Sequence, residues 1–170
     1  MESALPDAVR EALRDVPSLE LVSDVVTRTA RSLTGAQGAT FVLVEGDQCF
    51  YVDEDAIAPL WPGQRFPVAH CISGWAITHR EQVAVSEVFL DSRIPYEAYA
   101  PTFVRGLLMT PVGDPAVAAI GVYWSTPHKA TEQQAAVVAD LATEAAAAVE
   151  RIGRDAVPEP PWGMPPLTTG

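Results

Sequence analysis

One strand near the C-terminal end of the chain constrains the fold more than any other segment. Residues 116–125 are almost all apolar, whereas a strand with one solvated face would alternate apolar and polar side chains. We therefore expect this strand in the middle of a sheet that is covered on both faces. The two faces differ in size, because Ile120 and Val122 alternate with Ala119 and Gly121. The smaller face would let a helix or a ligand approach the backbone closely.

The residues around this strand predict a hairpin followed by a long helix. A first strand begins at Leu107, and Gly113-Asp114-Pro115 forms the turn. Thr131 then opens a helix, and Gln134 three residues later completes a capping-box pattern. Apolar residues recur at helical spacing from there to Ile152.

The first third of the chain predicts a helix and a second hairpin. Ser18 is a plausible N-cap for a helix that runs to about Leu33. The apolar run from Ala39 to Val44 indicates a central strand, and the return strand spans Cys49 to Val52. The acidic run at 53–55 then follows. Paired carboxylates suit a metal ion, but a solvated strand end is the favoured interpretation.

The middle of the chain is less regular. Residues 56–70 contain three prolines and one glycine without a clear period, which predicts a long loop. The aromatic residues of this loop either wall a pocket or complete the core. Cys71 to Arg80 is expected to form a short helix, and Gln82 to Val88 a strand near a sheet edge. Residues 91–105 form a second irregular stretch, with helical turns around Tyr96 to Phe103.

Four segments in succession resemble a GAF domain. They are "GATFVLVEGDQCFYVDED", "FPVAHCISGWAITHREQVAVSEV", "DSRIPYEAYAPTFVRGLLMTPV" and the closing "AAVVADLATEAAAAVERI" helix, and the resemblance spans Ser18 to Ile152. It implies an α/β (α+β) fold with a profilin-like three-layer arrangement. A mainly antiparallel sheet of five or six strands would carry the N- and C-terminal helices on one face. Loops and short helices would cover a ligand cavity on the other face.

The resemblance also implies which residues face that cavity. By position, the candidate ligand-binding residues are Tyr51, Phe66, Cys71, Trp75, Tyr96, Tyr99, Phe103 and Tyr123. Each of these side chains would serve equally well in an ordinary core. A slip of one residue in a strand exchanges its faces, so the strand positions are the most sensitive to this ambiguity.

Cys71 is the strongest candidate for a chemically reactive residue. A thiolate at a helix N-terminus is stabilised, although free cysteine is usually a small buried hydrophobe. His70 is adjacent to Cys71, but neighbouring residues rarely face one another as a catalytic pair. GAF-like enzymes that reduce free methionine sulfoxide use a set of cleft cysteines, and the two cysteines here match that arrangement poorly. Bilin, cyclic-nucleotide and haem sites also fit poorly, with His70 and His79 the only conceivable haem ligands. The cofactor is therefore left unknown, and no metal site is expected.

Composition limits the partners. The formal net charge is -11, which disfavours nucleic acid and anionic membrane surfaces because both carry negative charge. No apolar run is long enough to span a bilayer, and the N-terminal residues do not form a secretory signal. The chain has only two cysteines, which favours a reducing, cytoplasmic setting. The predicted organisation is a leader helix at 1–17, a GAF-like domain at 18–152 and a proline-rich disordered tail at 153–170.

The resemblance to GAF domains therefore implies a non-catalytic domain that senses a small molecule in signal transduction. It is expected to form a homodimer through helices 18–33 and 131–152, because the chain has a low content of charged residues and alanine is frequent between positions 135 and 148. A signalling kinase or cyclase is the expected partner. Two alternatives stay open: a thiol-dependent enzyme that resembles free methionine sulfoxide reductases, and a dimerisation scaffold with a vestigial pocket.

Overall fold

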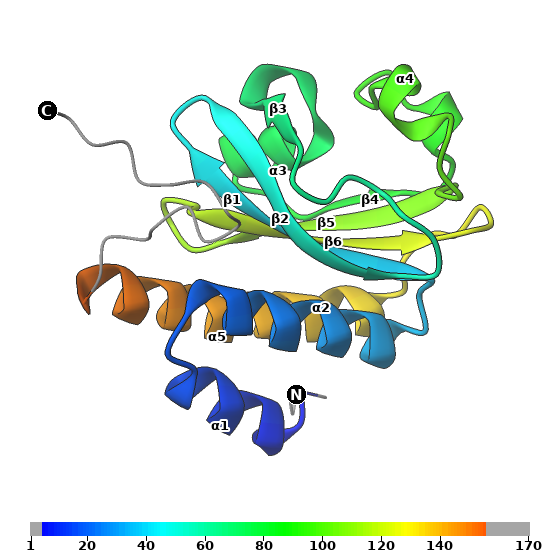
Figure 1. Cartoon of the computed structure of the whole chain (residues 1–170). Coiled ribbons are helices and arrows are strands. Elements are labelled where there is room, and N and C mark those ends of the chain that lie inside the picture. Colours follow the sequence, from blue (N-terminus) through cyan, green and yellow to red (C-terminus); the bar gives the residue numbers. More distant parts are fainter. Residues whose placement is uncertain (1–4, 156–170) are drawn as a thin grey trace, which may run out of the picture.

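The computed structural model describes residues 5–155 and shows one sheet with helices on both faces (Figure 1). Six strands form the sheet in the order β3-β2-β1-β6-β5-β4, and every neighbouring pair is antiparallel. The strands are β1 (Gly38–Glu45), β2 (Gln48–Ala56), β3 (Arg65–Pro67), β4 (Val83–Val85), β5 (Gly106–Val112) and β6 (Ala118–Trp124). This arrangement confirms the predicted mainly antiparallel α/β fold. The apolar strand β6 lies between β1 and β5, as its sequence indicates.

The helices divide between the two faces of the sheet (Figure 1). They are α1 (Asp7–Asp15), α2 (Leu19–Thr34), α3 (Ile72–His79), α4 (Tyr96–Tyr99) and α5 (Glu132–Asp155), with 3-10 turns η1 (Val68–His70) and η2 (Val88–Leu90). The long helices α2 and α5 lie side by side on one face, and α1 lies outside them. Helix α3 and the short elements cover the opposite face. None of the helices in residues 5–155 is long and apolar enough to cross a membrane.

Local capping signals fix the ends of the two long helices. Ser18 Oγ accepts a hydrogen bond from the Leu21 amide at 3.3 Å. At the start of α5, the Gln134 amide donates to Thr131 Oγ1 at 3.0 Å, and the Thr131 amide donates to Gln134 Oε1 at 2.9 Å. This reciprocal pair is the predicted capping box. Gln134 Nε2 also donates to the Thr34 carbonyl at 2.9 Å, which ties α5 to the end of α2.

The structure decides which face of β6 meets which layer. Ile120 and Val122 pack in the core beneath α2 and α5, whereas Ala119 and Tyr123 pack in a second core on the α3 side. The free space expected above Gly121 is occupied by the Tyr123 side chain, which a Cβ at Gly121 would strike. No helix or ligand is therefore needed to explain the glycine.

Two segments differ from the sequence prediction. Strand β2 continues to Ala56 and includes the acidic run, because it pairs along the whole of β1 with a register shift between Phe41 and Val42. Asp55 is paired there with Arg31 at 2.9 Å rather than left in solvent. The predicted loop 56–70 contains the edge strand β3 and the turn η1. Neither element is long enough to produce a recognisable hydrophobic period.

The N-terminal helix packs firmly on the domain. Leu13 is 1% exposed and belongs to the same core as α2 and α5. Arg151 Nη2 donates to the carbonyls of Leu13 at 3.0 Å and Val16 at 2.9 Å, so the side chain holds the end of α1. At the other terminus, α5 continues to Asp155. The rest of the predicted 153–170 tail lies outside the described residues.

Candidate functional site

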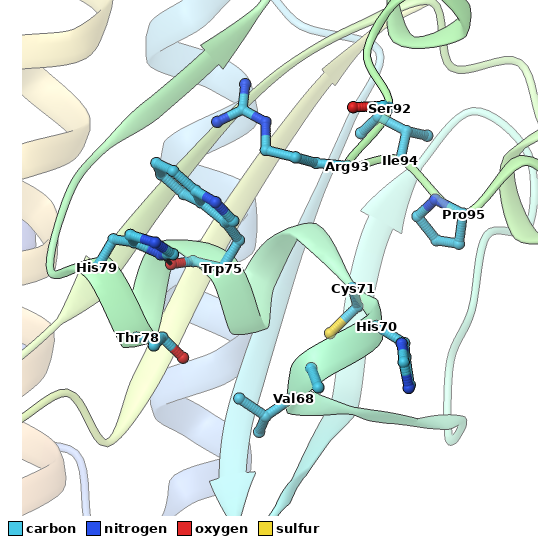
Figure 2. Close-up of a pocket in the computed structure, with 11 residues that line it drawn as sticks. Val68, His70, Cys71, Trp75, Thr78, His79, Ser92, Arg93, Ile94 and Pro95 are labelled. Atoms are coloured by element: carbon cyan, nitrogen blue, oxygen red, sulfur yellow. Dashed lines mark hydrogen bonds between the residues drawn. The ribbon is translucent and has the colours of Figure 1, made fainter.

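A cavity of about 450 Å³ lies on the α3 side of the sheet (Figure 2). Its walls are residues 68–71, then Trp75, Thr78 and His79 of α3, and finally residues 92–95 between η2 and α4. Two separate stretches of the chain, 68–79 and 92–95, therefore meet around one space. The volume is in the range of small-molecule sites in proteins.

One wall of the cavity combines stacked rings with a cation. Trp75 and His79 are one helical turn apart on α3, and their ring centroids are 4.0 Å apart in a stacked arrangement. The Arg93 side chain comes from the segment between η2 and α4, and its guanidinium carbon lies 4.5 Å from the Trp75 ring centroid (Figure 2). His79 Nδ1 lies 2.9 Å from the Trp75 carbonyl oxygen. A carbonyl only accepts, so Nδ1 carries the proton and donates to it.

Asp91 holds Arg93 in this position. Arg93 Nη2 donates to Asp91 Oδ2 at 2.6 Å, and Arg93 Nε donates to Asp91 Oδ1 at 3.0 Å. These hydrogen bonds lower the pKa of Asp91 and raise the pKa of Arg93, so the pair stays ionised at neutral pH. The fork geometry fixes the plane of the guanidinium and leaves its Nη1 without a hydrogen bond to Asp91.

Cys71 begins helix α3 and forms part of the cavity wall. Its Sγ accepts a hydrogen bond from the Gly74 amide at 3.4 Å, which makes the thiol the N-cap of the helix, as the sequence suggested. Gly74 is required here, because a Cβ at this position would overlap the backbone of Val68 in η1. The contact between Gly74 and Val68 brings η1 against α3 and so shapes one end of the cavity.

The structure brings the two cysteines together. Cys49 on β2 is hydrogen-bonded to Cys71, and Ser73 Oγ lies 3.3 Å from Cys71 Sγ. The hydrogen bond from Cys49 is the main cause that lowers the pKa of Cys71 to about 6, with contributions from Ser73, the Gly74 amide and His70. Burial opposes this shift. The same hydrogen bond, with burial, raises the pKa of Cys49 far above its usual value, so Cys49 keeps its proton.

A buried aromatic cluster belongs to the same core as this thiol pair, on the α3 side of the sheet. Trp61 contacts Tyr51, Tyr99 and Tyr123 with ring centroids 5.5, 4.7 and 5.4 Å away. Tyr51 Oη lies 3.0 Å from Ser73 Oγ, which links the cluster to the cysteines. Burial raises the pKa of Tyr51 and Tyr99, so both remain neutral phenols. The Tyr99 hydroxyl is buried without a hydrogen-bond partner among residues 5–155.

The predicted ligand-binding residues occupy three different settings. Cys71 and Trp75 line the cavity. Five others belong to the core on the same side of the sheet, either fully or partly buried: Tyr51, Phe66, Tyr99, Phe103 and Tyr123. Tyr96 is 66% exposed on α4 and is not among the residues that line the cavity. A direct ligand contact for those six residues stays a prediction from the resemblance.

The sequence did not predict a site role for Arg93 or Cys49, and it indicated His79 only as a conceivable haem ligand. The spacing of Trp75 and His79 at i and i+4 on the predicted helix was the available signal for their stacking. Arg93 lies in an irregular segment, and Cys49 lies on a strand distant from Cys71 in sequence. Nothing local in the sequence indicates either contact.

Comparison with solved structures finds the same fold in several proteins. The GAF domain of an Acinetobacter phosphoenolpyruvate-protein phosphotransferase superposes with a TM-score of 0.78 at 12% identity, covering 88% of this chain and 93% of that chain. A free methionine-R-sulfoxide reductase from Neisseria meningitidis gives a TM-score of 0.75 at 15% identity, covering 88% and 89%. The GAF-B domain of DevS from Mycobacterium smegmatis gives 0.66 at 19% identity, covering 80% and 96%. At these identities the similarity shows the fold alone.

No match is found among curated protein sequences. A family model described as the GAF domain matches residues 17–150, which is most of the chain and includes α2, the whole sheet and most of α5. The sequence match and the fold agree, and the chain belongs to the GAF domain family.

Proposed function

We propose that this GAF domain senses a small molecule bound in the cavity beside α3. The observation that supports this most directly is the cavity of about 450 Å³ whose wall joins the Trp75–His79 stack to the Arg93 guanidinium. Small-molecule sites combine apolar and aromatic walls with a few polar groups that orient the ligand. The proposed ligand is small and planar, with an acidic or strongly polar group.

The aromatic and polar groups at the cavity support a planar ligand with an acidic or strongly polar group. A planar ring would pack on the open face of His79 or against the edge of Trp75, because His79 and Arg93 already lie over the Trp75 ring. An acidic group would reach Arg93, whose Nη1 is free of Asp91. Because His79 Nδ1 donates to a backbone carbonyl, Nε2 is the ring nitrogen left to form a hydrogen bond with the ligand.

The test starts with native mass spectrometry of the purified protein, to identify any small molecule that remains bound. Thermal unfolding is then measured with aromatic carboxylates, of which benzoate is the simplest, and with the neutral amide benzamide. A ligand at a hundredfold excess over its Kd stabilises the folded state by about 2.7 kcal/mol. The carboxylates are expected to raise the Tm of the wild type more than benzamide does.

Two matched variants locate the binding. Arg93→Gln removes the guanidinium at the cavity and is expected to abolish the preference for the carboxylate. Arg28→Gln removes a 73% exposed arginine on α2, far from the cavity, and is expected to leave the preference unchanged. If the carboxylate series stabilises Arg93→Gln as much as the wild type, the ligand does not bind at this cavity.

A second candidate function is favoured by the pair of thiols. Cys71 combines a lowered pKa with a place on the cavity wall, which is what thiol chemistry on a small substrate requires. The enzyme of this kind with the same fold acts on free methionine-R-sulfoxide. Turnover of free methionine sulfoxide by the wild type that disappears in Cys71→Ser would replace the sensor proposal with an enzyme.

The wider setting forms part of the same proposal. We propose a homodimer through the α2–α5 layer, supported by the exposed Leu21 and Leu33 on α2. Because α1 packs on α2 and α5, the dimer contact would use the part of that layer that α1 leaves uncovered. A cytoplasmic location and a kinase or cyclase as the signalling partner remain proposals from the family resemblance and the charge.

A further inference from the structure

The two cysteines form a buried polar site that neither the fold nor the proposed ligand explains. Cys49 is fully buried on β2, and Cys71 is buried at the start of α3. Their thiols are hydrogen-bonded to one another, and Ser73 is hydrogen-bonded to both. Isolated buried cysteines usually behave as small apolar side chains. A pair in direct contact, with a shared hydroxyl partner, offers chemistry that one cysteine does not.

The backbone on both sides of the pair is held in place. Cys49 lies opposite Phe66 in the β2–β3 ladder, and the Val68 amide donates to the Asp47 carbonyl at 2.8 Å. The segment that leads to Cys71 is therefore anchored to the strand that carries Cys49. A disulfide bond requires the two Cβ atoms to be only about 4 Å apart. The anchoring keeps the two segments that carry Cys49 and Cys71 together and so favours closure of a disulfide.

We propose that Cys49 and Cys71 are a redox-active dithiol that reduces a small hydroperoxide and closes to a disulfide. Cys71 is the attacking residue and Cys49 the resolving one. Cys71 lines the cavity, whereas Cys49 lies behind it and is not part of the cavity wall. A hydroperoxide that enters the cavity would therefore meet Cys71 first.

The reaction takes place in two balanced steps. The Cys71 thiolate attacks one peroxide oxygen, the O–O bond breaks, and the departing hydroxide takes up a proton to become water. Cys71 is then a sulfenic acid. The Cys49 sulfur attacks the Cys71 sulfur, the S–O bond breaks, and the hydroxyl leaves with the Cys49 proton as a second water. Two thiols and one hydroperoxide yield one disulfide and two waters, or one water and an alcohol from an organic peroxide.

The surroundings of the two cysteines favour a thiolate at Cys71 and a protonated thiol at Cys49, as these two steps require. The Gly74 amide and Ser73 hydroxyl direct hydrogen-bond donors at Cys71, and they stabilise its thiolate. The hydrogen bond from Cys49 contributes most to the lowered pKa of Cys71, and the Ser73 and Gly74 contacts add to it, so the Cys71 thiolate is favoured at neutral pH. Cys49 retains its proton, which it must deliver in the second step.

Peptide mapping after brief treatment with hydrogen peroxide tests the proposal on the full chain. Trypsin cleaves after Arg31, Arg65 and Arg80, which places Cys49 and Cys71 in separate peptides, 32–65 and 66–80, that contain no methionine. Methionine oxidation therefore does not interfere. The wild type is expected to yield the two peptides joined by a disulfide, and dithiothreitol is expected to separate them.

The two single variants assign the roles. Cys49→Ser is expected to stop at the sulfenic acid, detected as a dimedone adduct on peptide 66–80. Cys71→Ser is expected to leave peptide 32–65 unmodified. Circular dichroism establishes that each variant is folded, and Cys49→Ala and Cys71→Ala serve as replacements for a serine variant that is not.

A measurement without peroxide separates this site from merely structural cysteines. The alkylation rate of Cys71 in the wild type is expected to rise with pH through a midpoint near 6, where its pKa lies. In Cys49→Ala the midpoint is expected to move up, and the rate at pH 7 is expected to fall by roughly tenfold. Wild-type peptides that stay unlinked after peroxide, or oxidation of Cys49 in Cys71→Ser at the wild-type rate, would overturn the proposal.

Discussion

Replacing Gly74 with alanine should break the contact that shapes the cavity. The added methyl group would overlap the Val68 carbonyl oxygen and would lie 2.6 Å from its carbonyl carbon and 2.7 Å from its Cα. These are backbone atoms, so no side-chain rotation relieves the overlap. Either η1 or the first turn of α3 must move, and the cap between Cys71 Sγ and the residue 74 amide is stretched as a result.

Two opposing effects set the size of the change. Alanine is favoured over glycine within a helix by about 1 kcal/mol. Overpacking a dense interior costs about 1–3 kcal/mol and occasionally more, and a clash with backbone belongs at the upper end of that range. A weakened N-cap adds about 1 kcal/mol. The net loss is therefore about 1–3 kcal/mol, which corresponds to a fall in Tm of roughly 2–10 °C for a chain of this size.

Gly153→Ala is the matched control. Gly153 lies in α5, and a Cβ there would meet nothing within 4 Å. Helix propensity alone predicts a gain of at most about 1 kcal/mol, reduced near the end of the helix. Differential scanning calorimetry of both variants measures the contrast. A Gly74→Ala protein that melts at or above the wild type would refute the steric reasoning and the rigid placement of η1 on α3.

Two further predictions concern other parts of the fold. Arg151→Ala is expected to cost about 1.5–3 kcal/mol at the site, because a charged donor to two carbonyls of the α1 end is lost, and to speed trypsin cleavage within α1. Arg28→Ala replaces an exposed arginine on α2 and should leave the rate of trypsin cleavage within α1 unchanged. Light scattering on the same samples measures the proposed homodimer, and a monomer at high micromolar concentration would contradict that proposal. Tyr123→Phe removes the 2.8 Å hydrogen bond to Thr40 and leaves a buried hydroxyl unpaired, so urea unfolding should show a loss of about 1–3 kcal/mol. Adding Thr40→Val should restore most of it, and a double variant less stable than the single one would show that the loss arises from packing instead.

The elements predicted well are those whose cause lies within a few residues of the chain. The capping box of Thr131 and Gln134 forms as expected, because both partners are one helical turn apart. The unbroken apolar run of β6 could only be satisfied between two covered faces, and the strand lies mid-sheet. The four GAF-like segments occur in the same order along this chain as in the family, and that order was sufficient to indicate the GAF fold.

Short elements and strand faces required the tertiary structure. Strand β3 has three residues and exists because it pairs with β2, so its own sequence contains no period from which to predict it. The sequence also left undetermined which residues of β6 face which side of the sheet, because shifting a strand by one residue exchanges its faces. Packing settled it by placing Ile120 and Val122 under α2 and α5.

The candidate site shows the same division. The sequence by itself determined that Cys71 would begin a helix and that Trp75 would follow one turn later, because both depend on local backbone hydrogen bonds. Only the tertiary structure decided that Arg93 would lie over Trp75 and that Cys49 would touch Cys71. These contacts join segments that the chain separates by a strand or a loop. Such contacts form when the sheet and the helix layers close together, and no short-range pattern in the sequence encodes them.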